Sequence, residues 1–504
     1  MKKRMKKMFK QKHKVVAKKM EGMMTAQEFK EYKCKYHHPD PQPITEYPVI
    51  VEAWAKEKKK YSRNIILSKH LTRPEDSKPV KSSHQKLIGN GNMLVIGGSG
   101  TGKTRSVILP NILQMNGSYV INDSTGDLLF TTGRLLKKHG YDIKVLDFTD
   151  AEHSNHYNPL YYIRTEQEVD LLIETIIFNT SMEHKSENDF WEQSERKLLS
   201  AVINYVVEGY TVGRTFSDVI DMLSLENPQD ASKFNDIFKD LPEESSARKC
   251  FTEFNTIAQS TRHSIFISAL CRLQIFIAPH INKITSSDDI EINSINEKKT
   301  AIFVIQGQDP TSSVITTMLY SQIRMNIYQK CEKNRKENDL AKYNPIPVFF
   351  MMDDLCHYCS MIPIELHHLS IVRMYGIHVL LTIDSISQLQ KLYPDDWRYI
   401  IGNCSNIIYL GSYEINTIDF ISKLTGQVVK KRKKNNHDEY VSLNILSTEQ
   451  LCRLPEDMCI VYMQNFKPLL DQKYNLKEHP YYAQTADDDK NNAFNYKTEL
   501  KEDQ

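Results

Sequence analysis

One stretch constrains this chain more than any other, the run of residues 93–113. Four apolar residues precede a glycine-rich turn there, and a helix-like run follows the turn. The turn satisfies the G-x-x-x-x-G-K-[ST] pattern of a P-loop, with the strand before it and the helix after it that the pattern requires. We therefore predict a nucleoside triphosphate site that is built from Gly97, Gly98, Ser99, Gly100, Thr101, Gly102, Lys103 and Thr104.

The spacing of the P-loop follows from the needs of a polyphosphate ligand. Glycines let backbone N–H groups turn inward around a phosphate, and the N-terminus of the following helix adds partial positive charge. The motif places Lys103 where it can reach the β- and γ-phosphates, and the Thr104 hydroxyl where it can bind Mg²⁺. A nucleoside triphosphate with Mg²⁺ is therefore the ligand that the sequence predicts.

A second signal of a nucleotide site comes much later, where the apolar residues 347–352 lead into Asp353 and Asp354. In P-loop ATPases the first acid of such a pair supports the Mg²⁺ shell, and the second orients or deprotonates the attacking water. An apolar run that ends in acids is weak evidence alone. Combined with the P-loop, it predicts that Asp353 shares the metal with Thr104 and that Asp354 is catalytic.

Strand-like apolar runs alternate with helix-like runs around these two motifs. Such alternation implies parallel strands joined by right-handed crossovers, and hence an α/β fold with a mostly parallel sheet. Polar groups at the carboxyl ends of these strands should face the phosphate site, which makes Asp123 a further candidate for cofactor binding. The expected strands after the P-loop are residues 118–122, 142–147, 300–305, 347–352, 378–383, 406–411 and 458–463.

The pattern changes between residues 166 and 290, where strand signals are scarce. Apolar residues recur there at helical spacing, as in Trp191, Leu198, Val202 and Val206. We read this stretch as an all-helical insertion, with Trp191 in its core. The insertion would divide the nucleotide-binding domain into residues 65–165 and 291–470.

The two ends of the chain differ from these domains. Residues 1–64 are predicted as a basic, polar N-terminal arm, because the first twenty residues contain ten Lys or Arg and no acid. Residues 471–504 are predicted as a polar, disordered tail. A second basic run, residues 430–434, is expected in a loop. For both basic runs, a solvated surface and a surface for nucleic acid remain open, and the arm has anionic lipid as a further candidate.

The sequence lacks two features that bear on where in the cell the protein is found, a transmembrane helix and a signal peptide. No stretch approaches 18 uninterrupted apolar residues, so no transmembrane helix is expected, and the basic N-terminus lacks the apolar core of a signal peptide. The nine cysteines are scattered, which suits a reducing cytosol. We expect a cytoplasmic protein, with peripheral contact to the inner face of the cell membrane through the basic arm as a possibility.

A series of short motifs runs in order over residues 65–463. It comprises residues 95–104, Pro110-Asn111, Asp123, Gly126-Asp127-Leu128, Ser154, Tyr157-Asn158-Pro159, Phe190-Trp191-Glu192, Ser264-Ile265, Arg272-Leu273, Ser387-Gln388-Leu389, Ile401-Gly402-Asn403-Cys404 and Leu410-Gly411. Each motif is weak alone, but their collinear order is specific. The chain thereby resembles the TraG-like coupling proteins of conjugative type IV secretion, which are hexameric RecA-like ATPases that pump DNA.

This resemblance implies a RecA-like P-loop NTPase that uses ATP and Mg²⁺ to move single-stranded DNA, with its relaxase, toward a secretion channel. A homo-hexamer with DNA in its centre would contact mostly phosphates, independently of sequence. The resemblance also places a trans-acting arginine on Arg373, in a helix expected before residues 378–383, where it would stabilise phosphoryl charge in a neighbouring subunit. It places Trp191 where the family meets its relaxosome or substrate.

The chain departs from the family at three positions. Asp354 replaces a Glu, Asp384 replaces a "sensor" Gln near the phosphates, and Thr125 replaces a Lys. The shorter Asp354 stands about 1 Å further from a water, and a displacement of that order can cost about 10²-fold in rate. Two alternatives to a DNA pump therefore stay open, namely a nucleotide-binding adaptor with weak hydrolysis that recruits substrate, and an ATPase that acts on protein.

Overall fold

The computed structural model describes most of the chain from residue 90 onward and a few segments before it. The described ranges are 24–25, 64–74, 90–180, 190–211, 213–225, 232–307, 311–336, 346–358, 367–434, 437–464, 466 and 468–499. Most of the predicted N-terminal arm therefore lies outside the described residues.

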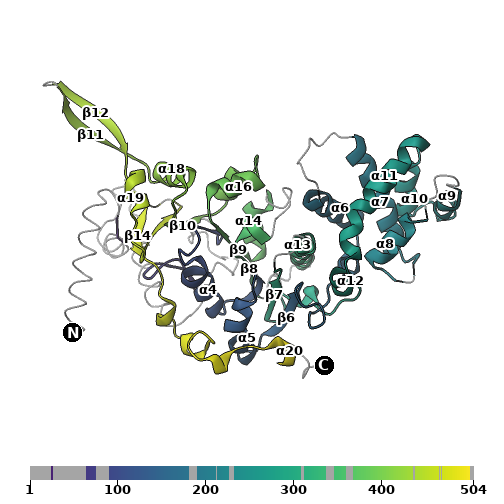
Figure 1. Ribbon diagram of the computed structural model, residues 1–504, viewed down its shortest axis with the longest axis horizontal. Helices are drawn as coiled ribbons and strands as arrows, with labels where there is room; N and C mark the ends of the chain where they lie inside the picture. The colour runs from purple at the N-terminus through teal and green to yellow at the C-terminus, as the bar shows by residue number, and fades with distance from the viewer. Residues whose placement is uncertain are drawn as a thin grey trace.

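A ten-stranded sheet forms the centre of the protein (Figure 1). Its seven strands from β10 to β6 pair in parallel, whereas β13 is antiparallel to both β10 and β14. The mostly parallel α/β fold is thus confirmed. In spatial order the strands are β1 (Met24–Thr25), β14 (Leu469–Gln472), β13 (Met458–Met463), β10 (Asn406–Gly411), β4 (Met93–Gly97), β9 (Ile377–Ile383), β8 (Val348–Met352), β5 (Ser118–Asn122), β7 (Thr300–Ile305) and β6 (Asp142–Asp147).

The central strands are continuous apolar runs because both faces of the sheet are covered. Residues of β4 alternate between two cores, with Leu94 and Ile96 in one and Met93 and Val95 in the other. Helices α4 (Leu109–Leu113) and α5 (Asp127–Lys138) contribute to the core of Val95. The opposite core includes residues of α13 (Ser312–Lys336), α16 (Ile386–Leu392), α17 (Trp397–Gly402), α18 (Ile415–Leu424) and α19 (Thr448–Cys452).

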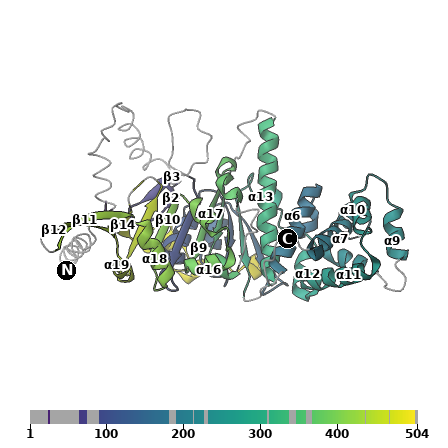
Figure 2. The same ribbon diagram turned by 90° about the horizontal axis from the view of Figure 1, so that it is seen from above.

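A group of helices lies between β6 and β7 in the sequence, in the stretch whose spacing indicated helices. Figure 2 shows α13 between this group and the sheet. The buried Glu195 of α7 accepts hydrogen bonds from Arg272 of α11, one of them 2.7 Å long, and this pair ties two long helices together. The group comprises α6 (Glu166–Thr180), α7 (Phe190–Val207), α8 (Phe216–Leu223), α9 (Ser232–Lys239), α10 (Ser246–Phe254), α11 (Gln259–Leu273) and α12 (Pro279–Thr285).

Trp191 does not lie in the core of these helices, contrary to our expectation. It sits at the first turn of α7 with 50% of its surface exposed, beside the exposed Phe190. The helical periodicity was right for Leu198, Val202 and Val206, which are fully buried. Trp191 is the second residue of α7, where the helix has only begun, so periodicity alone misplaced it.

The C-terminal segment is ordered as far as Glu499, so the prediction of a disordered tail from residue 471 is wrong for these residues. We call residues 473–499 the C-terminal strap; it includes the short α20 (Tyr496–Glu499). Phe494 is buried against Gly133 of α5, and its N–H donates to Phe130 O. Arg134 pairs with Glu499 at 2.6 Å. A few specific anchors therefore hold a segment whose average composition is polar.

Two further expectations are corrected by the fold. The basic residues 430–434 lie on a strand, because β11 (Gln427–Lys434) pairs antiparallel with β12 (His437–Asn444) in a hairpin (Figure 1). The helix expected around Arg373 is instead a pair of 3₁₀ turns, His367–Ser370 and Val372–Tyr375. Gly376 ends the second turn with a left-handed φ of 64°, directly before β9.

A small hairpin, β2 (Asn64–Ile66) and β3 (Thr72–Pro74), packs near the antiparallel edge of the sheet. Its turn is held by Asp471 of β14, which accepts hydrogen bonds from Ser68 and His70 at 2.7–2.9 Å. Within the described ranges, no individual helix has the length and apolar character needed to cross a membrane; one pair of helices, bent by 82° between residues 277 and 279, meets those two criteria jointly.

Candidate nucleotide site

The P-loop turns back on itself directly after β4. Gly100 and Gly102 adopt left-handed φ values of 75° and 89°, which glycine reaches at low cost. A side chain at position 97 would meet the Thr101 hydroxyl at 2.4 Å. Gly98 N–H donates to Gly411 O at 2.9 Å, so the loop is also fastened to the end of β10. These glycines let the loop close tightly enough to surround a phosphate.

The helix after the loop begins with an unusually wide turn. Residues Thr104–Ile108 form a π-helical turn that continues into α4. Pro110 has no N–H to donate to the preceding turn, and a π turn accommodates such a gap. The next residue, Asn111, is buried. Its side chain accepts a hydrogen bond from Ile66 N–H and donates one to Ile66 O, which ties β2 to the helix. The Pro-Asn pair thus shapes and anchors the helix that points at the phosphate site.

The predicted metal residues meet at the carboxyl ends of β4 and β8. The Thr104 hydroxyl donates to Asp353 Oδ2 at 2.6 Å, although 249 positions separate the two residues. The other oxygen, Oδ1, accepts from the Thr382 hydroxyl at 2.6 Å. Burial raises the pKa of Asp353, while these two hydrogen bonds partly offset the effect. The pair is therefore prearranged as two oxygen ligands on one side of the loop.

Lys103 lies among three carboxylates. Its ammonium donates to Asp384 and to Gly97 O, the latter at 3.1 Å, and lies 3.5 Å from Asp354 Oδ1. The side chain is only 8% exposed. Burial alone would lower its pKa, but the hydrogen bond to Asp384 and the charges of Asp354, Asp384 and Asp353 raise it overall. Lys103 is therefore charged, and the acids around it outnumber it.

This arrangement fits Mg²⁺ carried by a polyphosphate. The described residues contain no cluster of three His, Cys, Asp or Glu that could cage a metal alone. Mg²⁺ commonly binds through one or two protein oxygens, substrate phosphates and water. Thr104 and Asp353 provide the protein oxygens, and the buried Oδ1 of Asp354 accepts no hydrogen bond from the described residues. The excess negative charge would repel a bare polyphosphate and favour its magnesium complex.

Asp354 adopts a left-handed φ of 52°, which is uncommon for a residue other than glycine. Its N–H donates to Thr382 Oγ1 at 2.8 Å, so the same threonine holds both acids of the pair. The strained backbone turns the Asp354 carboxylate toward Lys103 rather than along the strand. Strain of this kind is often found at functional sites.

The remaining predicted residues lie away from these contacts. Asp123 caps α5, where its two oxygens accept from Gly126 N and Leu129 N, and burial raises its pKa to about 6. Thr125 donates to Asp127 in the same turn. Arg373 precedes β9, whereas Asp384 follows it. This seven-residue strand therefore places them about 20 Å apart, at opposite ends of the strand. Nucleotide contact by Asp123 stays a prediction.

Two functional candidates escaped the sequence analysis. Thr382, which holds the acid pair, interrupts the apolar run of β9 one residue before the strand ends, and that interruption was a usable signal. Lys473 of the C-terminal strap donates to Thr101 O of the P-loop at 2.8 Å. Its sequence neighbourhood is polar and has no motif, so only the fold shows the contact.

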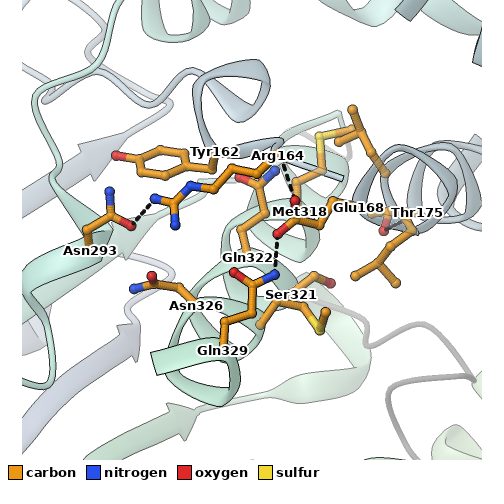
Figure 3. Close-up of a pocket in the computed structure, with 13 residues that line it drawn as sticks. Tyr162, Arg164, Glu168, Thr175, Asn293, Met318, Ser321, Gln322, Asn326 and Gln329 are labelled. Carbon is orange, nitrogen blue, oxygen red and sulfur yellow. Dashed lines mark hydrogen bonds between the residues drawn. The ribbon is translucent and has the colours of Figure 1, made fainter. Parts of the chain in front are cut away.

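A pocket lies between α6 and α13, away from the P-loop site (Figure 3). Gln329 of α13 donates to Glu168 of α6 at 2.7 Å, and Arg164 donates to Asn293 at 3.3 Å. Two pairs of its polar side chains are thus bonded to each other within the pocket. The pocket marks the place where the helical insertion meets the sheet domain.

Comparisons with known proteins agree with this architecture. A family model described as "Type IV secretory system Conjugative DNA transfer" matches residues 51–486. Protein VirD4 of Rhizobium radiobacter is 22% identical over 412 residues, which are 77% of this chain and 57% of VirD4. The conjugal transfer protein TraG of the same organism is 22% identical over 385 residues, 73% of this chain and 57% of TraG. The chain thus spans little more than half the length of these curated relatives.

Solved structures of a coupling protein share the fold. Unbound TrwBdeltaN70, described as a bacterial conjugative coupling protein, superposes with a TM-score of 0.61 at 17% identity and covers 84% of this chain and 92% of its own. The plasmid coupling protein TrwB in complex with ADP and Mg²⁺ superposes with a TM-score of 0.60 at 15% identity, with the same coverage. At this identity the likeness shows the fold, which is that of RecA-like coupling proteins.

Proposed function

Because this chain belongs to the type IV secretory system conjugative DNA transfer family, we propose that it is the ATP-dependent coupling protein of a conjugation apparatus. In this role it binds single-stranded DNA, together with a relaxase, and moves it toward the secretion channel. The observation that carries the proposal is the 2.6 Å contact between Thr104 and Asp353 beside the buried Lys103. This contact brings together the residues that follow β4 and β8, two strands that are separated in the sheet by β9 alone.

In the proposed mechanism, Thr104 and Asp353 hold Mg²⁺, and the N–H groups of the P-loop surround the β-phosphate. The metal supplies charge that stabilises the leaving phosphate. Lys103 would leave Asp384 and bind the β- and γ-phosphates. Asp354 would accept a proton from the water as its oxygen attacks the γ-phosphorus, and the bond to the β–γ bridging oxygen would break to release ADP. Arg373 is too far from its own P-loop to take part, so it would serve a neighbouring subunit of a homo-hexamer.

Asp384 has a separate role in this proposal, because it competes with the γ-phosphate for Lys103. We expect Asp384→Gln to bind an ATP analogue about tenfold more tightly, since the change frees the ammonium and removes one negative charge beside the phosphates. Titration with a fluorescent ATP analogue, with Asp395→Asn as a control at an exposed acid, measures the effect. Weaker binding by Asp384→Gln would contradict competition and indicate that Asp384 itself contacts the nucleotide.

The DNA-moving activity can be tested on the purified full chain by phosphate release with and without single-stranded DNA. We expect hydrolysis to rise several-fold with DNA, and DNA affinity to fall by about 10²-fold or more between 50 and 200 mM salt, as for binding through several phosphates. Hydrolysis that responds to a secreted protein but not to DNA would instead favour the protein motor. Nucleotide binding without any stimulated turnover would favour the adaptor. This is the second candidate function because Asp354 and Asp384 stand where the family has other residues.

The partners and place of action follow from the family rather than from any contact within this chain. We propose that the protein works at the cytoplasmic face of the cell membrane, where it meets channel components and relaxosome proteins. Its N-terminal basic arm would add attraction to anionic lipid, worth about 1 kcal/mol for each Lys or Arg near the surface.

A further inference from the structure

The C-terminal strap runs from the antiparallel edge of the sheet to α5 and passes the P-loop on the way (Figure 1). It begins directly after β14, where the N–H of Lys473 donates to Asp457 O at 2.8 Å. It ends in α20, where Glu499 pairs with Arg134 and Lys497 pairs with Asp150. Phe494 is buried near this end. Both ends of the strap are therefore fixed, and its middle contacts Arg105, which directly follows the P-loop.

The strap touches the P-loop on both sides of Lys103 and Thr104. On one side, the Lys473 ammonium donates to Thr101 O at 2.8 Å. On the other side, Asp487 accepts two hydrogen bonds from the Arg105 guanidinium, at 2.7 and 3.1 Å. These contacts hold the backbone on either side of the N–H groups that the P-loop presents to phosphates. The segment that the strap brackets is thus the one that must keep its shape to bind nucleotide.

The charge of Lys473 is only partly compensated. Burial lowers the pKa of Lys473, while the nearby charges of Glu456 and Asp457 offset part of this effect. Among the described residues, no carboxylate forms an ion pair with the Lys473 ammonium within 4.0 Å. A half-buried cation without a direct counter-ion gains from an anion in the adjacent loop. Nucleotide binding should therefore favour the docked position of the strap.

We propose that the C-terminal strap is a positioning element of the nucleotide site, in which Lys473 and the Arg105–Asp487 pair preorganise the P-loop. By linkage, strap docking raises nucleotide affinity and bound nucleotide holds the strap down by the same factor. Lys473 acts through Thr101 and is a positioning residue. The proposal rests on the proposed function only in so far as the P-loop binds nucleotide.

The test uses the full chain and ADP with Mg²⁺ in two measurements, affinity by calorimetry and hydrogen exchange of the strap amides with and without nucleotide. We expect Lys473→Met to weaken binding about tenfold and Asp487→Asn to weaken it several-fold. Lys473→Arg should recover most of the affinity, and kcat at saturating ATP should change less than twofold. Lys490→Met is the matched control, because it removes an exposed lysine of the same strap and leaves the anchoring pairs at its ends in place.

In the wild type, nucleotide should slow exchange at the amides of Thr485 and Ala486, and Lys473→Met should abolish this slowing. If Lys473→Met and Asp487→Asn bind nucleotide as the wild type does, or if exchange of the strap ignores bound nucleotide, the strap is merely structural and the proposal fails. If the wild type binds no nucleotide, the proposed function fails first and the strap proposal fails with it. The two failures are therefore distinguishable.

Discussion

Replacing Lys103 with alanine will abolish detectable ATP binding and lower hydrolysis by about 10³-fold. The ammonium is the one cation that the P-loop directs at the β- and γ-phosphates, and removing a single preorganised charge donor commonly costs 10²- to 10³-fold. Here we expect a loss at the upper end of that range, because Lys103 also offsets the charges of Asp354 and Asp384. Without it, these acids face the incoming phosphates uncompensated. Equilibrium binding of a fluorescent ATP analogue and steady-state phosphate release measure the effect.

The control for Lys103→Ala is Lys138→Ala, which removes an exposed lysine at the end of α5. This variant should bind and hydrolyse ATP as the wild type does. Thermal unfolding should show that Lys103→Ala remains folded, since it leaves the apolar cores on both faces of β4 intact. ATP binding that survives in Lys103→Ala would mean that the loop does not hold a triphosphate, and the ATPase assignment would then be wrong.

Asp353→Asn will lower hydrolysis by at least about 10²-fold through loss of the metal. The amide has the shape of the carboxylate and can still bond to Thr104 and Thr382, so the local structure should persist. However, the neutral amide is a poor ligand for Mg²⁺, which prefers carboxylate oxygen. Binding of the ATP analogue should therefore lose its dependence on Mg²⁺. Titrations with Mg²⁺ and with EDTA, in the wild type and the variant, provide the measurement.

The neighbouring acid provides the contrast. Asp354→Asn should keep Mg²⁺-dependent binding and lose turnover, because we assign Asp354 to the attacking water and not to the metal. If the two variants show the same pattern, the division of roles between the acids is incorrect. If Asp353→Asn hydrolyses ATP at the wild-type rate in Mg²⁺, the metal is held elsewhere.

The P-loop and the acid pair were recognisable in the sequence because each is a local pattern whose chemistry dictates its spacing. The meeting of Thr104 with Asp353 also followed, since parallel strands direct their carboxyl ends to one edge of the sheet. The position of Arg373 before β9 was also predicted from the sequence. Its local structure was not, because helical spacing predicted a helix where the chain forms two 3₁₀ turns.

The C-terminal strap was missed for a different reason. Composition describes an average, and residues 473–499 are polar on average. Three buried apolar residues, Leu476, Ala486 and Phe494, together with ion pairs to Arg105, Arg134 and Asp150, are enough to fix the segment. Each of these partners lies more than 300 positions away, and no local pattern can announce such pairings. The basic residues 430–434 were misread similarly, because strand pairing with β12 replaced the expected loop.

The order of the strands has a consequence for how this site can respond to ligands. β9 lies between β4 and β8 and is hydrogen-bonded to both, so the strand end that leads into the P-loop and the strand ends that precede Asp353 and Asp384 are held at fixed spacing. These strand ends cannot move apart without breaking hydrogen bonds of the sheet. The acidic side chains that follow them can therefore adjust to a ligand mainly by changing rotamer. The fixed carboxylates of Asp353, Asp354 and Asp384 would therefore disfavour binding of a free polyphosphate and favour binding of its complex with a divalent cation.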